Sequence, residues 1–237
     1  MKFRPEDPTI LFHSAEEVEE AVREIGFLPL FAGEIKGLSV EEHTPRELWF
    51  ADNVDGPWEW KGPIARTGEI GYAKYFRNKA VFVSQEWLPR LINVRRAGKP
   101  MGYDEERVLR AIVANESMIS TEIREECGFG PHGATAAERM MYANMGGEGA
   151  SRLSLDTVLT RLQMKGRIVA CDFVYDIAKN GKQYGWGKAK YTTPEIFFAD
   201  WFKMPDEKPE ESRIAIVAHL LKVCPGVDNK LLHKIVG

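Results

Sequence analysis

The chain has 237 residues, of which 44% are hydrophobic, 11% aromatic and 28% charged. This composition is typical of a globular protein and excludes collagen-like, coiled-coil and intrinsically disordered chains. The net charge of −3 is divided into blocks along the chain: −9 over residues 1–60, +7 over 61–100, −5 over 101–150 and +5 over 151–190. Two positive blocks of this kind favour a polyanionic partner, although solvated surfaces produce the same pattern by chance.

Residues 14–25 predict an amphipathic helix. Ser14 is suited to cap it, Glu17 follows three residues later as in a capping box, and apolar residues recur at helical spacing. Gly26 is expected to end the helix.

The next segment, residues 28–96, gives mixed signals, because glycines interrupt short aromatic runs. Only residues 79–84 predict a strand, and a short one. Gly98-Lys99-Pro100 is the best candidate for a domain boundary. We therefore assign residues 1–98 to an N-terminal α+β region that contains a basic, aromatic segment.

Three helices are predicted after this boundary. The first covers residues 104–115, and the second, 122–127, is expected to be capped by Ser120-Thr121. The third begins after Ser154, and its apolar residues Leu155, Val158, Leu159 and Leu162 follow the i, i+3, i+4, i+7 spacing.

A β-hairpin is predicted directly after the third helix. Residues 167–177 and 182–192 are rich in β-branched and aromatic side chains, and Asn180-Gly181 between them suits a type I′ turn. Three helices followed by a hairpin are typical of a winged helix, a helix-turn-helix with a two-stranded wing. The expected fold is therefore α+β, with a winged-helix domain at 99–195 and a C-terminal helical cap at 196–237.

Two features complicate this assignment. A long insertion, residues 129–150, separates the second and third helices and is expected to hold a short helix at 134–145. In addition, the N-terminal region could contain a second, degenerate winged-helix unit.

Double-stranded DNA is the partner that the basic residues favour, because cations on the third helix and the wing can reach phosphates and base edges. Cations interleaved with aromatic side chains in the N-terminal region strengthen this prediction. The candidate DNA-binding residues are Thr157, Thr160, Arg161, Lys165 and Arg167 on and after the third helix, Lys179, Lys182, Lys188 and Lys190 on the wing, and Lys61, Arg66, Lys74 and Arg77 in the N-terminal region.

Two stretches resemble the AlkZ-like winged-helix DNA glycosylases and their AlkZ-related branch. Residues 55–66, Asp-Gly-Pro-Trp-Glu-Trp-Lys-Gly-Pro-Ile-Ala-Arg, resemble a Gly/Trp-rich segment of these proteins, and residues 169–177 resemble their wing strand. The resemblance implies tandem winged-helix units that form a concave DNA-binding surface, and hydrolysis of the glycosidic bond of alkylated purines.

The catalytic signature of that family is a glutamine followed two residues later by Gln or Asp. Gln85, Gln163 and Gln183 of this chain are followed at that spacing by Trp87, Lys165 and Gly185. The chain is also shorter than the full set of winged-helix units would require. The resemblance therefore implies the DNA-binding architecture, and the catalytic residues stay unknown.

Three hypotheses follow. The favoured one is a winged-helix protein that binds duplex DNA and is associated with DNA repair. The second is an active glycosylase acting on alkylated bases, with residues 58–77 lining a base pocket. The third is a protein-binding scaffold, because winged helices also bind proteins.

No metal site or cofactor is predicted. His219, Cys224 and His233 lie in one region and Cys127 and His132 in another, and neither set gives four zinc ligands. A cytoplasmic location without a membrane span is expected, because residues 214–221 are too short an apolar stretch to cross a bilayer, the N-terminus lacks a signal peptide, and the cysteines suggest no disulfides.

Overall fold

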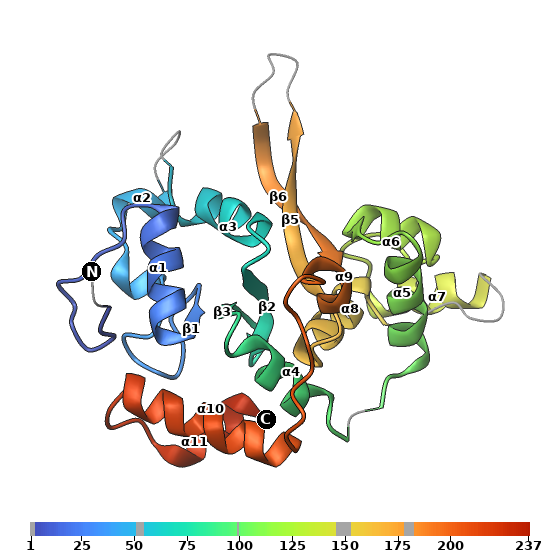
Figure 1. Ribbon diagram of the computed structural model, residues 1–237. Helices are drawn as coiled ribbons and strands as arrows, with labels where there is room; N and C mark the ends of the chain where they lie inside the picture. The colour runs from blue at the N-terminus through green and yellow to red at the C-terminus, as the bar shows by residue number, and fades with distance from the viewer. Residues whose placement is uncertain (1–2, 51–54, 99, 146–152, 178–182) are drawn as a thin grey trace.

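The computed structural model describes residues 3–50, 55–98, 100–145, 153–177 and 183–237. It is a mixed α+β structure with two small antiparallel sheets, each three-stranded (Figure 1). The predicted α+β class is therefore confirmed.

The first sheet belongs to residues 15–84, which we call the first repeat. Its strands lie in the order β1-β3-β2, so the last strand is central. The elements are α1 (Ala15–Ile25), β1 (Phe27–Pro29), the 3-10 helix η1 (Glu41–His43), α2 (Glu47–Phe50), α3 (Pro57–Arg66), β2 (Ile70–Phe76) and β3 (Lys79–Ser84). Helix α4 (Leu88–Arg96) leads out of it.

The second sheet belongs to residues 103–192, the second repeat, and its order β4-β6-β5 again places the last strand in the centre. The elements are α5 (Tyr103–Ala114), β4 (Met118–Ile119), α6 (Ser120–Glu126), α7 (Ala136–Met145), α8 (Leu155–Met164), β5 (Val169–Ile177) and β6 (Gln183–Thr192). Helices α9 (Pro194–Phe197), α10 (Pro209–Val223) and α11 (Asn229–Val236) follow.

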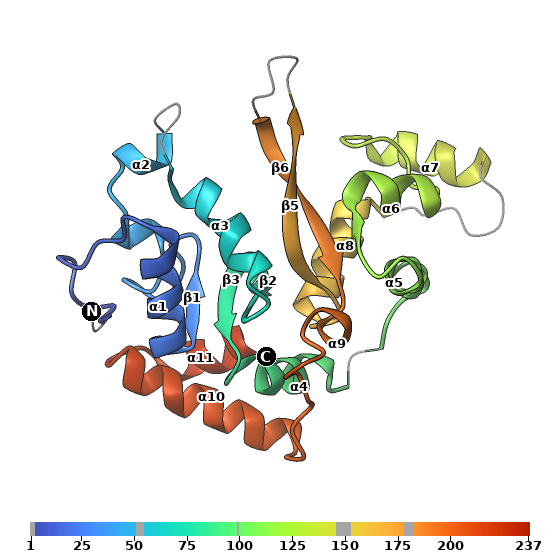
Figure 2. The same cartoon turned by 45° about the horizontal axis from the view of Figure 1, so that its top comes forward.

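The two repeats share one topology. Each runs helix, short strand, helices, then a two-stranded hairpin, and each pairs the short strand with the last strand of the hairpin. The hairpin β5–β6 projects from the middle of the molecule, between the first repeat and helices α5 and α6 (Figures 1 and 2).

Several predicted helix ends are confirmed. The Ser14 side chain accepts a hydrogen bond from the Glu17 N–H, and Gly26 ends α1 with a φ of 81°. Ser154 caps α8 in the same way, through the Thr157 N–H. The apolar stripe of α8 is buried as its spacing predicts. These features are local, so the sequence determines them well.

Other boundaries differ from the predictions. Helix α6 begins at Ser120, so Ser120-Thr121 do not precede it as caps. Instead, Glu122 closes a capping interaction by accepting from the Ile119 N–H. Helix α3 was not predicted, because a glycine and two prolines interrupt its sequence. Pro57 stands at the start of the helix, where proline is tolerated, and Glu59 accepts from the Gly56 N–H.

The buried side chains form two clusters. One joins the first repeat to the C-terminal helices and to three residues of β5, and the other lies within the second repeat between α5, α6 and α8. Helices α10 and α11 pack against α4 and lie under the first repeat (Figure 1). The domain limits at 98 and 195 stay a prediction. Within the described residues, no helix has the length and apolar character needed to cross a membrane.

Candidate nucleic-acid surface and pocket

The two basic blocks of the sequence meet where β2 of the first repeat packs on α8 of the second. Lys74 Nζ donates to Thr160 Oγ1 at 3.1 Å, and the Lys74 N–H donates to Gln163 Oε1, also at 3.1 Å. The Asn78 N–H points to the sulfur of Met164 at 3.4 Å. Helix α8 of the second repeat and the β2–β3 hairpin of the first repeat therefore form one surface.

This packing covers part of the α8 face that was predicted to be open. Thr157 and Thr160 are half-buried, and Arg161 is exposed. The periodicity predicted correctly which side of α8 enters the core of the second repeat, but the pattern of one helix carries no information about contacts with the first repeat. Arg161 forms no ion pair with the described residues.

The turn between β2 and β3 holds two further cations at the edge of this surface. Arg77 and Asn78 have φ values of 47° and 66°, as the two central residues of a type I′ hairpin turn require. Arg77, Asn78 and Lys79 are exposed. We call the surface formed by Lys74, Arg77, Asn78, Lys79, Thr160, Arg161 and Met164 the hairpin–helix surface.

Other candidate cations are paired with carboxylates. Arg66 Nη1 lies 2.8 Å from Asp172 Oδ1, and Lys188 Nζ lies 2.7 Å from Asp176 Oδ1. Both pairs are substantially exposed. Lys165, at the end of α8, is mostly buried against Glu105 and also donates to a backbone carbonyl.

Lys61 lies in the interior, at the contact between α3 and β5. Only 7% of the residue is exposed, and Nζ donates to the Trp58 carbonyl. The ammonium lies 4.7 Å from the centre of the Phe173 ring, 5.2 Å from Trp58 and 5.9 Å from Tyr175. Burial lowers the pKa of Lys61 to about 8, and the negative charge of Glu59 partly opposes this effect. Lys61 therefore contributes no exposed charge.

Of the remaining candidate DNA-binding residues, Arg167 and Lys190 lie within the described part of the chain, and Lys179 and Lys182 do not. Arg167 and Lys190 are half-buried, and the Arg167 Nε has no hydrogen-bond partner among the described residues. Burial, together with the nearby charge of Arg96, lowers the pKa of Arg167. Lys179 and Lys182, with the predicted Asn180-Gly181 turn, lie outside the described residues.

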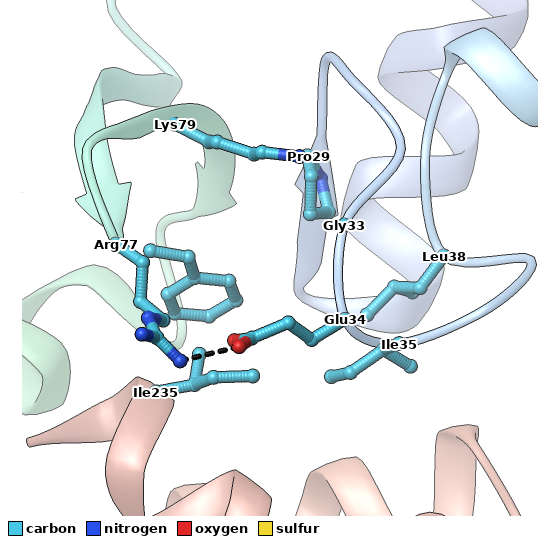
Figure 3. A pocket seen from close by; sticks show the side chains of 9 residues that line it. Pro29, Gly33, Glu34, Ile35, Leu38, Arg77, Lys79 and Ile235 are labelled. Carbon is cyan, nitrogen blue, oxygen red and sulfur yellow. Dashed lines mark hydrogen bonds and ion pairs between the residues drawn. The ribbon is translucent and has the colours of Figure 1, made fainter.

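A pocket of about 280 Å³ lies beside the Arg77 turn (Figure 3). The loop after β1, the β2–β3 turn and the end of α11 enclose it. Its apolar lining is Pro29, Ile35, Leu38, Phe76 and Ile235, and its charged residues are Glu34, Arg77 and Lys79. Arg77 Nη1 forms an ion pair with Glu34 across the pocket.

The described residues give no sign of metal or thiol chemistry. No group of three His, Cys, Asp or Glu side chains within them could hold a metal ion. Cys127, Cys171 and Cys224 are buried free thiols. Burial raises the pKa of Cys171 to about 11 and that of Cys224 to about 12, so these thiols are poor nucleophiles at neutral pH.

Comparison with known proteins identifies the family. Residues 12–237 match the family model described as AlkZ related, so the chain belongs to the AlkZ-related family. This result confirms the predicted resemblance to the AlkZ-related branch. Among solved structures, the chain is similar to the Streptomyces sahachiroi DNA glycosylase AlkZ, with 14% sequence identity and a TM-score of 0.49. The match covers 98% of this chain and 60% of that one. No curated protein sequence matches the chain significantly.

Lys79 belongs to the predicted basic, aromatic segment but not to the candidate DNA-binding residues, and no pattern in the sequence predicted the pocket. Lys79 lies in the predicted strand 79–84, and its position directly after the short Arg77-Asn78 turn could have indicated an exposed tip. The pocket joins residues 29–38 to Ile235, about two hundred positions apart in the sequence. Periodicity carries no signal for a contact of that separation.

Proposed function

We propose that each repeat is a winged-helix unit and that the protein binds double-stranded DNA through the hairpin–helix surface. The observation that carries this proposal is the contact between the two basic blocks: Lys74 and Asn78 bond to Thr160 and Met164 of α8. The exposed cations Arg77, Lys79 and Arg161 are sequence neighbours of these contact residues. Membership of the AlkZ-related family supports a role in DNA repair.

The ion pairs on this surface do not prevent phosphate binding. Arg77 and Glu34 have 45% and 41% of their side chains exposed, and such exposed pairs contribute only about 0–1 kcal/mol. A phosphate can therefore replace the carboxylate at small energetic cost. Arg66 and Lys188 are available to a duplex for the same reason. Lys61 and Lys165 are not, because their burial fixes their contacts.

The salt dependence of binding tests the proposal. Fluorescence anisotropy with a labelled duplex, measured over a range of salt concentrations, should give a log–log slope of about −0.9 for each phosphate contacted. Arg161→Ala and Arg77→Ala should each weaken binding and each reduce the slope by about 1. Arg213→Ala is the matched control, because Arg213 is a surface arginine on α10 that is also paired with a carboxylate. Binding without salt dependence, or equal effects of all three substitutions, contradicts the proposal.

The same experiment separates the scaffold hypothesis. A protein-binding scaffold would show no saturable duplex binding at low salt, and it would retain partners in a pull-down after nuclease treatment. For the glycosylase hypothesis, Trp60 and Tyr72 of the expected base-pocket segment 58–77 are at most 6% exposed and belong to the core, whereas Phe76 and Arg77 line the pocket beside the Arg77 turn.

A further inference from the structure

We propose that the pocket beside the Arg77 turn binds a small organic anion: a carboxylate attached to an apolar body. This inference goes beyond DNA binding, because the ligand is a free small molecule and the pocket shares only Arg77 and Lys79 with the hairpin–helix surface. At about 280 Å³, the pocket is slightly smaller than the usual range for drug-sized ligands, so it suits a smaller compound.

The floor of the pocket requires an apolar body. Ile35, Leu38, Phe76 and Ile235 line it, and each of them is at most 6% exposed in the folded chain. These four side chains come from three separate parts of the sequence: the loop after β1, the end of β2, and α11. Because the core elements hold them, the pocket is formed before any ligand arrives, which reduces the entropic cost of binding.

The charged residues of the pocket require an anion. Two cations, Arg77 and Lys79, face one carboxylate, Glu34, so the lining carries a net positive charge. Lys79 Nζ donates to the Ala32 carbonyl, which leaves its charge without a carboxylate partner among the described residues. Within the described part of the chain, Arg77 forms an ion pair with Glu34 alone.

Glu34 shows how a ligand carboxylate would be held. Its carboxylate reaches across the pocket to the Arg77 guanidinium, as Figure 3 shows. Glu34 is itself exposed and sits on a loop, so a ligand carboxylate can take its place without disturbing the core. Arginine is suited to this exchange because its planar guanidinium matches a carboxylate with paired hydrogen bonds.

Octanoate is a suitable probe, and 1-octanol is its neutral counterpart. Isothermal titration calorimetry with the full chain should show saturable octanoate binding, about tenfold tighter than that of 1-octanol because of the charge-assisted contacts. Arg77→Ala should reduce octanoate affinity to that of 1-octanol. Gly33→Leu should weaken both ligands, because Gly33 lines the pocket and a Cβ there meets no atom within 4 Å.

Arg66→Ala is the matched control. Arg66 is 50% exposed and paired with a carboxylate, as Arg77 is, but it does not line the pocket. Its substitution should leave octanoate affinity unchanged. The proposal is overturned if octanoate shows no saturable binding, if 1-octanol binds equally well, or if neither Arg77→Ala nor Gly33→Leu alters the octanoate Kd.

A link to DNA binding rests on the proposed function. Because Arg77 belongs to both the pocket and the hairpin–helix surface, saturating octanoate should raise the apparent Kd for duplex DNA in the wild type and not in Gly33→Leu. Failure of the pocket proposal can be distinguished from failure of the proposed function. Binding of octanoate without binding of duplex supports the pocket proposal alone, and binding of duplex without binding of octanoate supports only the proposed function.

Discussion

Replacing Lys61 with methionine tests how the interior tolerates an ammonium group that forms no ion pair with the described residues. Methionine has a similar length and keeps the aliphatic contacts, so the change removes mainly the charge and its hydrogen bond to Trp58. Burial lowers the pKa of Lys61 from 10.5 to about 8. The folded state therefore binds the proton less tightly than the unfolded state does.

The direction of the pH dependence follows from this difference. Below pH 8, Lys61 is protonated in both states, and the folded protein bears the full cost of burying the charge. Between pH 8 and 10.5 the unfolded chain binds more protons, so the contribution of Lys61 to stability improves as pH rises. At about 1.4 kcal/mol per pKa unit, this range corresponds to about 3 kcal/mol.

The aromatic rings around the Lys61 ammonium oppose the destabilising effect of burial. Cation–π contacts contribute roughly 0.5–2 kcal/mol each, and they favour the charged form. If burial dominates, Lys61→Met should be more stable than the wild type at pH 7, and the advantage should shrink by about 3 kcal/mol on raising the pH to 10.5. Urea denaturation at a series of pH values measures both quantities.

The quantity to compare is the difference between the two proteins at each pH. Tyrosines such as Tyr191, whose pKa burial raises from 10 to about 12, lose their protons in this range only in the unfolded state, and their contribution cancels in the difference. Lys208→Met, at an exposed position, controls for the loss of one surface charge. A difference between Lys61→Met and wild type that stays constant from pH 7 to 10.5 would refute the argument.

Three other substitutions test local features of the second repeat. Ser154→Ala removes the cap of α8 and should lower the free energy of unfolding by about 1 kcal/mol in urea denaturation; no change would show that another group satisfies the freed N–H. Lys165→Met leaves Glu105 buried without its cation and should cost about 3–5 kcal/mol, while adding Glu105→Leu should recover most of the loss; a double variant no better than the single one would contradict this pairing. Gly187→Ala places a Cβ 2.7 Å from the Tyr175 ring and should lower the melting temperature, since the ring must shift; an unchanged value would show that the hairpin adapts freely.

Local features of the fold could be predicted from the sequence because neighbouring residues decide them. The caps at Ser14 and Ser154 and the buried stripe of α8 need only the helical period and a polar side chain at the right offset. The AlkZ-related family was also accessible, through short stretches whose order along the chain carries the resemblance. Helix α3 was not, because its start depends on Gly56 and Pro57, which also suit a turn.

What the sequence determined by itself is the helices and the hairpin of the second repeat, helix α1 and strand β3 of the first repeat, and the sign of the charges in each. Only the tertiary structure decided which of those charges stay exposed. Lys61 and Arg66 lie close together in the sequence, yet one is enclosed by aromatic rings and the other lies at the surface. The hairpin–helix surface and the pocket are likewise products of packing, because both combine side chains from distant segments, and the energy of such contacts depends on positions in space that the local sequence does not encode.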